Sequence, residues 1–378
     1  MEQDYTSAYV LSSTDLGELF SALTRRDYTI IGPTIRDGAV HYRPIDSVEE
    51  LPTGWRDEQG PGSCRLVEDD RGLHFGCTLA AESWKRYLHP PKSTLFVANG
   101  GRHGFEFEAT EPDVPRYAFL GVRPCELRAI EIQDRVLRTS AHADPYYAAV
   151  RDNALIVAVS CIRAGENCFC RSMNTGPKAT GGFDLALTEV ADSTGHFFLV
   201  ETGSDEGVSI CGELPVRDAD RKSVAAAEAA VQAAAGQMKK HLDTDDLPAL
   251  LGRNLDHPRW DEIANRCLSC GNCTLVCPTC FCTAVEDRTE PGTQRAERLR
   301  VWDSCFNSRF SYIHGGSVRQ SIGSRYRQWM THKLSTWHDQ FGTSGCVGCG
   351  RCVTWCPVGI DITEEAAAIR AADRGAGS

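Results

Sequence analysis

The stretch Cys267-Leu-Ser-Cys270-Gly-Asn-Cys273-Thr-Leu-Val-Cys277-Pro278 decides how this sequence folds, because its pattern returns at Cys346-Val-Gly-Cys349-Gly-Arg-Cys352-Val-Thr-Trp-Cys356-Pro357. Both copies read C-x2-C-x2-C-x3-C-P. A cubane iron–sulfur cluster needs four thiolates that converge from different directions, and two-residue gaps let a tightly turning loop aim three sulfurs at one point. The repeat therefore predicts two [4Fe–4S] clusters in the C-terminal third of the chain.

The fourth ligand of each cluster is expected from the other run. In two-cluster ferredoxins the cysteine before the proline binds the distant cluster. One cluster is therefore predicted to take Cys267, Cys270, Cys273 and Cys356, and the second to take Cys346, Cys349, Cys352 and Cys277. Glycines at 271, 348 and 350 would let backbone amides approach the sulfurs. C-x2-C pairs also bind zinc, but three cysteines and a Cys-Pro, repeated twice, favour iron–sulfur.

Composition and length limit the possible classes of protein. With 378 residues and 42% hydrophobic residues, the chain can form two or three globular domains, which excludes a single small ferredoxin. We expect no membrane span, because no apolar run approaches the roughly 18 residues that a spanning helix needs. The N-terminus has neither a basic nor an apolar signal region, so we expect a cytoplasmic protein. Cytosolic thiols stay reduced, and the 18 cysteines therefore indicate metal binding rather than disulfides.

The net charge of −11 argues against nucleic acid as a partner, since phosphate binding needs a basic face. One segment between the two cysteine runs is locally basic. A solvated helix face or internal ion pairs are the preferred interpretation of its arginines. They are Arg288, Arg295, Arg298, Arg300, Arg309, Arg319, Arg325 and Arg327.

Short β-type runs lie at 28–31, 93–97, 117–122, 154–159 and 196–200, and they alternate with Gly/Pro turns and predicted helices in the first half of the chain. The Ala-, Glu- and Lys-rich stretch 219–241 predicts a long helix. From about residue 250 onward strands are scarce, and helices are expected at 247–251 and 258–266. We therefore predict an α+β protein: an N-terminal α/β-type domain (1–218), a connecting helix (219–250) and a mainly helical, ferredoxin-like domain with two [4Fe–4S] clusters (251–378).

Ten cysteines lie outside the eight ligands. Cys125, Cys161, Cys168 and Cys170 lie in the N-terminal half, and they form either a third cluster site or a set of buried, inert thiols. Cys280, Cys282 and Cys305 lie close to the first run, where they would complete a further site or act as redox-active thiols. The isolated Cys64, Cys77 and Cys211 are interpreted as core residues.

The sequence also lacks several catalytic and nucleotide-binding motifs. It contains no G-x-G-x-x-G after a strand and no G-x4-G-K-[ST], so it shows no dinucleotide or nucleotide fingerprint. Neither G-x-S-x-G nor H-E-x-x-H is present. If the chain passes electrons but holds no site for two-electron chemistry, its electron donor and acceptor lie on partner chains.

Five segments resemble the β subunit of cytoplasmic sulfhydrogenases, which belong to the NAD(P)-linked [NiFe] hydrogenases, and the related A subunit of anaerobic sulfite reductase. The resemblance spans about residues 117–362 and is weak over the first hundred residues. The segments are Phe119-Leu-Gly-Val-Arg-Pro-Cys125-Glu-Leu-Arg-Ala-Ile130, Ser160-Cys161 with Cys168-Phe-Cys170, Arg266-Cys267 through Cys277-Pro-Thr-Cys280-Phe-Cys282, Trp302-Asp-Ser-Cys305, and Gly345-Cys346 through Cys356-Pro357.

The resemblance implies a non-catalytic subunit that relays electrons between a [NiFe] hydrogenase module, with small and large subunits, and a subunit that binds flavin and NAD(P). It also favours an additional cluster at Cys125, Cys161, Cys168 and Cys170. The corresponding subunit of an anaerobic sulfite reductase is the nearest alternative. A thiol/disulfide enzyme similar to heterodisulfide reductase, which would use Cys280, Cys282 and Cys305, is a second alternative, and a zinc-stabilised binding module is a third.

Overall fold

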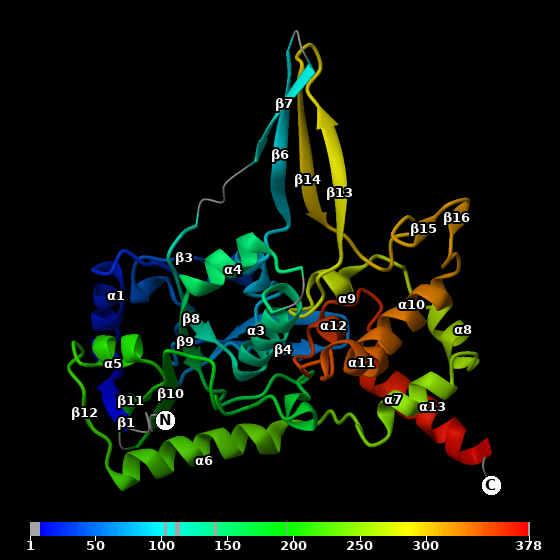
Figure 1. Cartoon of the computed structure of the whole chain (residues 1–378). Helices are drawn as coiled ribbons and strands as arrows, with labels where there is room; N and C mark the ends of the chain where they lie inside the picture. Colours follow the sequence, from blue (N-terminus) through cyan, green and yellow to red (C-terminus); the bar gives the residue numbers. More distant parts are fainter. Residues whose placement is uncertain (1–7, 102–103, 110–113, 140–141, 194, 377–378) are drawn as a thin grey trace.

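The computed structural model describes residues 8–101, 104–109, 114–139, 142–193 and 195–376. An N-terminal body with a large mixed sheet lies beside a helical C-terminal part that contains both cysteine runs. A narrow antiparallel sheet projects from between them (Figure 1). The predicted α+β class is confirmed. None of the described helices has the length and apolar character that a membrane span requires.

The sheet of the N-terminal body has eight strands in the order β12-β1-β11-β10-β9-β8-β2-β3. Its centre, β2, β8, β9 and β10, is parallel, and the outer strands pair antiparallel. Central parallel strands are covered on both faces and are therefore continuously apolar, as in β9, whose five residues are all buried. The strands are β1 (Ala8–Ser12), β2 (Thr29–Arg36), β3 (Ala39–Pro44), β8 (Tyr117–Val122), β9 (Leu155–Val159), β10 (Leu185–Asp192), β11 (Gly195–Thr202) and β12 (Arg217–Asp218). All five predicted β-type runs are strands, four of them in this sheet.

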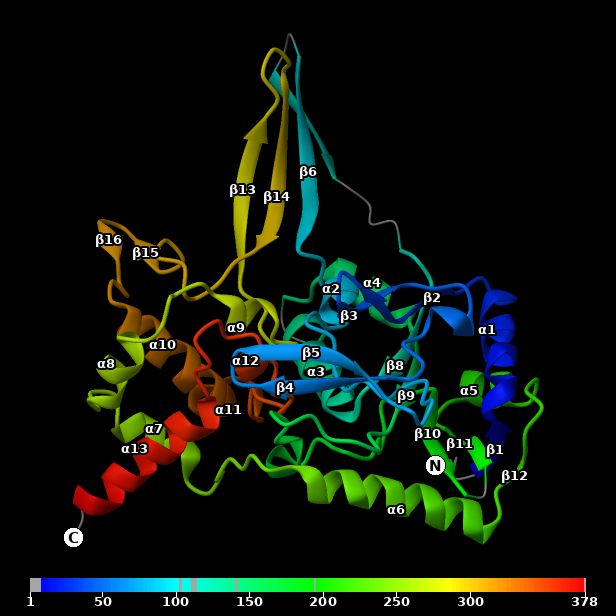
Figure 2. The ribbon, with the colours of Figure 1, turned by 180° about the vertical axis from the view of Figure 1, so that it is seen from behind.

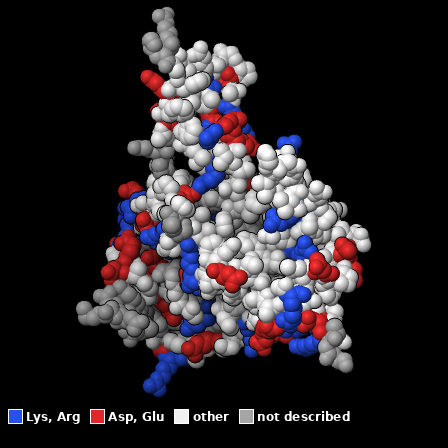
Figure 3. Space-filling view, turned by 45° about the vertical axis from the view of Figure 1, so that its right-hand side comes forward, with Lys and Arg blue, Asp and Glu red and all other residues white. Residues whose placement is uncertain are grey.

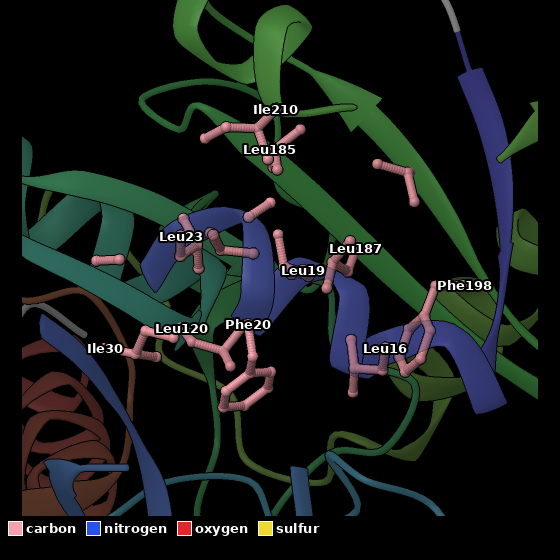
Figure 4. Close-up of a cluster of buried hydrophobic side chains, with 14 of the residues drawn as sticks. Leu16, Leu19, Phe20, Leu23, Ile30, Leu120, Leu185, Leu187, Phe198 and Ile210 are labelled. Atoms are coloured by element: carbon pink, nitrogen blue, oxygen red, sulfur yellow. The ribbon is translucent and has the colours of Figure 1, made fainter. Parts of the chain in front are cut away.

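Helices cover both faces of this sheet. On one face, α1 (Leu16–Thr24) and α5 (Asp205–Cys211) bury leucines and Ile210 against β8, β10 and β11 (Figure 4). On the other face, α3 (Pro124–Leu137) and α4 (Pro145–Asp152) pack on Phe119 and Ile156. Each fully buried leucine or phenylalanine contributes about 1.5–3 kcal/mol. The result is a three-layer body that holds β8 and the start of α3 rigidly.

The predicted long helix is α6 (Arg221–Gln237), which begins at the N-cap Asp220 and packs Ala227 against Val10 and Leu199 of the sheet. It ends earlier than expected, and residues 238–246 form neither helix nor strand before α7 (Leu247–Arg253). The prediction of one connecting helix over 219–250 is therefore wrong at residues 238–246, whereas the helix expected at 247–251 is present as α7. Helix α6 packs on the sheet of the N-terminal body. The predicted domain boundaries at 218 and 250 stay a prediction.

The expectation that strands are scarce after residue 250 is wrong for residues 283–302. These residues form β13 (Thr283–Thr289) and β14 (Arg295–Trp302), which pair with β6 (Lys92–Gly101) and β7 (Gly104–Ala109) in the projecting sheet. Their charged sequence hides the strand pattern, and most side chains of β13 are exposed. The pairing of β14 with β6 is a long-range contact, which local sequence patterns do not report.

The arginine-rich segment is largely neutralised by ion pairs. Five of its eight arginines pair with acidic residues, which confirms the ion-pair interpretation for those five, and Figure 3 shows both signs of charge interspersed on the face that it presents. The pairs are Arg288–Glu286, Arg295–Glu297, Arg298–Asp287, Arg300–Asp144 and Arg327–Asp256.

The C-terminal part is helical apart from a small hairpin, and its core is built from aromatic and aliphatic side chains such as Trp260, Trp329 and Ile369. Its helices are α8 (Arg259–Ala264), α9 (Asn272–Leu275), α10 (Ile322–Thr331), the π-helical turn η4 (His332–Thr336), α11 (Trp337–Phe341), α12 (Arg351–Thr354) and α13 (Ile362–Ala376). The remaining short elements of the chain are η1 (Ser13–Asp15), η2 (Val48–Glu50), β4 (Trp55–Gly60), β5 (Ser63–Glu68), α2 (Lys85–Leu88), η3 (Cys170–Met173), β15 (Tyr312–Ile313) and β16 (Gly316–Ser317).

A buried ion pair joins the C-terminal part to the N-terminal body. Arg351, at the start of α12, donates from Nη2 to Glu126 Oε1 at 2.5 Å and from Nε to the carbonyl of Ala80 at 2.8 Å. Both side chains of the pair are 1% exposed. Glu126 also accepts hydrogen bonds from the Tyr42 hydroxyl and the Trp84 indole. The second cysteine run is thereby held against the first turn of α3.

The β4–β5 hairpin makes a second contact between the two parts (Figure 2). Its turn lies against the end of the second run, where Gly62 N donates to the carbonyl of Val353 at 3.0 Å. Nearby, the Asn167 amide donates to Gly60 O and to the Thr354 hydroxyl. Two separate segments of the N-terminal body therefore fix α12.

Removing one member of a buried ion pair leaves the other charge unpaired and costs about 3–5 kcal/mol. We therefore expect Arg351→Met to lower the apparent Tm of anaerobically purified protein, and Glu126→Gln in the same chain to restore part of the loss. Arg65→Ala is the control, since Arg65 is 76% exposed and pairs with Glu58 at the surface. Equal thermal unfolding of Arg351→Met and Arg65→Ala would contradict this role of the pair.

Candidate metal centres

The two cysteine runs fold alike. Ser269 and Gly348, which occupy the same place in each run, both have positive φ and donate their amides to Cys267 Sγ and Cys346 Sγ, each at 3.4 Å. Gly271 and Gly350 then begin the short helices α9 and α12, both with φ of 77°. Amide donors to cysteine sulfur are a usual way in which proteins tune iron–sulfur clusters. Each run thus forms a loop of the same conformation, with the same amide donor to its first sulfur.

The first thiol group lies near the surface of the C-terminal part. Cys267, Cys270, Cys273 and Cys356 line one cavity, together with Phe306, Tyr326 and Trp329. The structure therefore brings Cys356, from the second run, to the thiols of the first. Ile360 N donates to Cys356 Sγ at 3.3 Å. Cys270 is the one exposed thiol of this group.

The second thiol group is deeper in the protein. Cys277, from the first run, is close enough to Cys346, Cys349 and Cys352 for its charge to act on all three thiols. Burial raises the pKa of Cys346 to about 12 and that of Cys352 well above its usual range. The cysteine before proline in each run thus lies beside the three other thiols of the opposite run.

The four N-terminal cysteines form a third group. Cys125, Cys161, Cys168 and Cys170 line a single cavity, with Arg123 and Met238 at its edge. Cys125 comes from the first turn of α3, Cys161 and Cys168 come from the loop that follows β9, and Cys170 begins η3. Burial raises the pKa of Cys168 to about 12. The isolated Cys77 and Cys211 are buried in hydrophobic clusters, as expected, whereas Cys64 is half-buried in β5.

The second and third groups are in direct contact. Phe169 N donates to the carbonyl of Gly348 at 2.9 Å, and the Thr175 hydroxyl donates to Val347 O at 2.6 Å. A Cβ on Gly348 would lie 2.7 Å from Cys170 Cα, which is closer than real Cβ atoms approach backbone. The backbone of the second run therefore packs tightly on the loop that carries three thiols of the third group.

A fourth set of thiols follows the first run. Cys280 contacts Cys277, and Cys282 contacts Cys305. The contact with Cys305 and the charges of Lys333 and Lys85 lower the pKa of Cys282 to about 7, whereas its proximity to Cys282 and its burial raise the pKa of Cys305. Cys282 thus differs from thiols such as Cys346 and Cys168, for which burial is the largest cause of a raised pKa.

Sequence reasoning did not identify Lys85, Lys333, Arg351 and Glu126. Lys333 Nζ donates to Cys277 Sγ at 3.2 Å, although the two residues are far apart in the chain. Arg351 lies inside the second run, and its position between Cys349 and Cys352 was the available signal. Nothing in the local sequence marks either lysine, because only the fold brings them to the thiols.

Buried thiols with raised pKa values are protonated near neutral pH, and metal binding deprotonates them with release of protons. The arrangement of thiols, amide donors and buried cations defines an iron–sulfur protein of the two-cluster ferredoxin type. Residues 266–360 match the family model described as a 4Fe-4S dicluster domain. The chain is also 34% identical, over 88% of its length and 89% of the relative's, to sulfhydrogenase 2 subunit beta from Pyrococcus furiosus.

The chain therefore belongs to the sulfhydrogenase β-subunit family, and it is an iron–sulfur electron-transfer subunit. The alignment with the relative extends over most of the chain. The match is thus wider than the segments from about 117 to 362 that carried the resemblance in the sequence.

The close approach at Gly348 gives a test of how the groups are assembled. Gly348 and Gly342 both have φ of 68°, but a Cβ on Gly342 would meet nothing within 4 Å. Alanine costs about 1–3 kcal/mol of backbone strain at either position, and only Gly348→Ala adds a clash with Cys170. We expect Gly348→Ala to lose iron per chain, measured on anaerobically purified protein, and Gly342→Ala to keep it. Equal iron in both variants would show that the close packing is not required.

Proposed function

We propose that the chain relays electrons between a [NiFe] hydrogenase module, made of small and large subunits, and a subunit that binds flavin and NAD(P). Two [4Fe–4S] clusters would be held by the first and second thiol groups, and a third by Cys125, Cys161, Cys168 and Cys170. We expect the complex in the cytoplasm, a prediction that rests on the sequence alone. The family membership supports a hydrogenase complex, since the relative is named as a sulfhydrogenase subunit.

The observation that carries this proposal is the continuity of the three thiol groups. Cys273 of the first group lies close enough to Cys352 of the second for its charge to raise the pKa of Cys352. Cys349 of the second group likewise raises the pKa of Cys125 and Cys170 in the third. The path leads from the exposed Cys270 to the interior of the N-terminal body. Electrons could thus cross from one half of the chain to the other through adjacent clusters.

The spacing of the thiols supports clusters over zinc. In a tetrahedral site with Zn–S bonds of about 2.3 Å, the sulfurs lie within about 4 Å of each other. Among the described residues, only His74, Glu189 and His196 bring three potential ligand atoms within 4.8 Å of one another, and this group contains no cysteine. The thiol groups are therefore wider than a single zinc ion requires, as a cluster of several irons needs.

The relay can be tested in the reconstituted complex. We expect H2-dependent reduction of NAD(P)+ to require this chain, because the hydrogenase module and the flavin subunit would have no other route for electrons. Reduction of a viologen dye by the hydrogenase module alone should persist without it. Co-purification with a sulfite-reducing subunit would favour the sulfite reductase alternative, and NAD(P)+ reduction at the same rate without the chain would contradict the relay.

The crossed ligation makes a specific prediction for single variants. Cys277→Ala should remove the EPR signal of the cluster held mainly by the second run, and Cys267→Ala that of the cluster held mainly by the first. Cys211→Ala is the control, since this thiol lies in the core of the N-terminal body. If each variant removed only the cluster of its own run, the assignment would be wrong.

The same measurement tests the third group. Replacing Cys125 and Cys168 together by alanine should remove about four irons per chain, the content of one [4Fe–4S] cluster. The signals of the two ferredoxin-type clusters should remain. Unchanged iron would show that these four thiols are structural.

A further inference from the structure

Three cysteines that neither ferredoxin run needs lie together beside the second thiol group, and two buried lysines face them. We propose that Cys280, Cys282 and Cys305 hold a further iron–sulfur cluster, with Lys85 and Lys333 as its buried counter-charges. This inference rests on the proposed relay and adds a cluster to it. The argument uses the placement of the thiols, the charge balance around them and the spacing between them.

Two segments distant in sequence carry the three thiols. Cys280 and Cys282 follow the Cys-Pro of the first run, and Cys305 follows β14. Asp303 N donates to the carbonyl of Cys282 at 2.9 Å, which fixes one segment against the other. Cys305 also lies close enough to Cys273 of the first group for the charge of Cys273 to raise its pKa. Cys277 of the second group raises the pKa of Cys280 in the same way. The set therefore lies between the two ferredoxin-type groups.

Both lysines are buried, with 5% of Lys85 and 3% of Lys333 exposed. Lys85 Nζ donates to the carbonyls of Cys280 at 3.0 Å and Leu275 at 3.4 Å, and lies 4.1 Å from the centre of the Trp302 ring. Lys333 lies in the π-helical turn η4, a distortion that often marks functional sites.

The hydrogen bonds of Lys333 complete the charge picture. It donates to Cys277 Sγ at 3.2 Å, to the Thr279 hydroxyl at 3.1 Å and to Gly345 O at 3.1 Å. Within the described residues, no acidic side chain forms an ion pair with either lysine. Burying an ammonium group without an anion is costly. The thiols are the groups that can supply the missing negative charge, and they do so as thiolates on a cluster.

The charge balance also distinguishes this proposal from a disulfide. A disulfide between Cys282 and Cys305 would be neutral and would remove the charge of Cys282 that faces both lysines, so that Lys333 would keep only the thiols of the second group, such as Cys277. A zinc ion is disfavoured by spacing, because in the described part of the chain no three thiols have sulfurs within 4.8 Å of one another. A cluster satisfies the charge requirement, since its thiolates are anionic, and it can bind three thiols that do not converge on one zinc ion.

The proposed cluster has three cysteine ligands, because Cys277 belongs to the second group. One iron then lacks a cysteine, and such an iron is the first to be lost on oxidation. Treatment of the full-length protein with ferricyanide should convert [4Fe–4S]2+ into [3Fe–4S]+, with release of one Fe2+ and of one electron to the ferricyanide. The ferredoxin-type clusters, with four cysteines each, should resist the same treatment.

The first test compares iron per chain in the wild type and in the triple variant C280A/C282A/C305A of the full-length protein. We expect about four irons fewer in the variant, with the EPR signals of the ferredoxin-type clusters retained. Cys64→Ser is the matched control, since Cys64 is a half-buried thiol outside all groups. Unchanged iron in the triple variant overturns the proposal, whereas a wild type without iron overturns the proposed function itself.

If the triple variant fails to fold, the wild type decides the matter. A [3Fe–4S] EPR signal after mild ferricyanide oxidation, absent from Cys282→Ser, supports the proposal, and the absence of that signal from the wild type overturns it. Lys85→Met should also lower the midpoint potential of this cluster, because it removes a positive charge, and Lys85→Arg should restore it. Lys92→Met, an exposed position at the start of β6, is the control. A potential that is the same in Lys85→Met and Lys92→Met would refute the counter-charge role.

Discussion

The guanidinium of Arg351 is buried between two cysteines of the second run, and its charge has to be met inside the protein. Glu126 meets it, and Glu126 is the residue after Cys125 of the third thiol group. One ion pair therefore joins the second and third groups and fixes the C-terminal part on the N-terminal body. A buried pair of this kind adds little net stability over apolar packing, but it enforces one arrangement because every other arrangement leaves a charge unpaired.

Buried cations accompany each of the thiol groups, and this pattern extends beyond Arg351. The positive charge of a nearby cation favours the thiolate form, and so works to lower the pKa, of one thiol in each group. These pairs are Arg325 with Cys267 in the first group, Lys333 with Cys346 in the second, and Arg123 with Cys161 in the third. Arg325 and Arg123 donate to backbone carbonyls, as in the bonds from Arg123 to Phe75 O and Cys77 O. Positive charge held in a low-dielectric interior stabilises anions there. The protein is thus built to hold negative charge at the places where the thiols converge.

The sequence predicted the parts of the molecule whose signals are local. The repeat of four cysteines and a proline predicted two thiol groups, and the structure brings Cys277 and Cys356 to the opposite runs. Apolar runs such as β8 and β9 were predicted because both faces of a central strand are buried. The early end of α6 was missed because residues 238–241 have good helix propensity, while Lys240 instead pairs with the buried Asp361. Tertiary contact overrides propensity there.

Contacts between distant segments were not predictable, and the projecting sheet explains why they matter. Its strands β13 and β14 belong to the chain between the two cysteine runs, and β6 and β7 belong to the N-terminal body. The long connection is therefore anchored at its middle: Trp302 N donates to Pro91 O, and the Trp302 indole donates to His89 O. The entropy of closing a loop grows with its length, so this anchor divides one long closure into two shorter ones. It also places Cys305, three residues after the end of β14, beside Cys282, directly before β13, so that the same pairing which shortens the loop also assembles the fourth set of thiols.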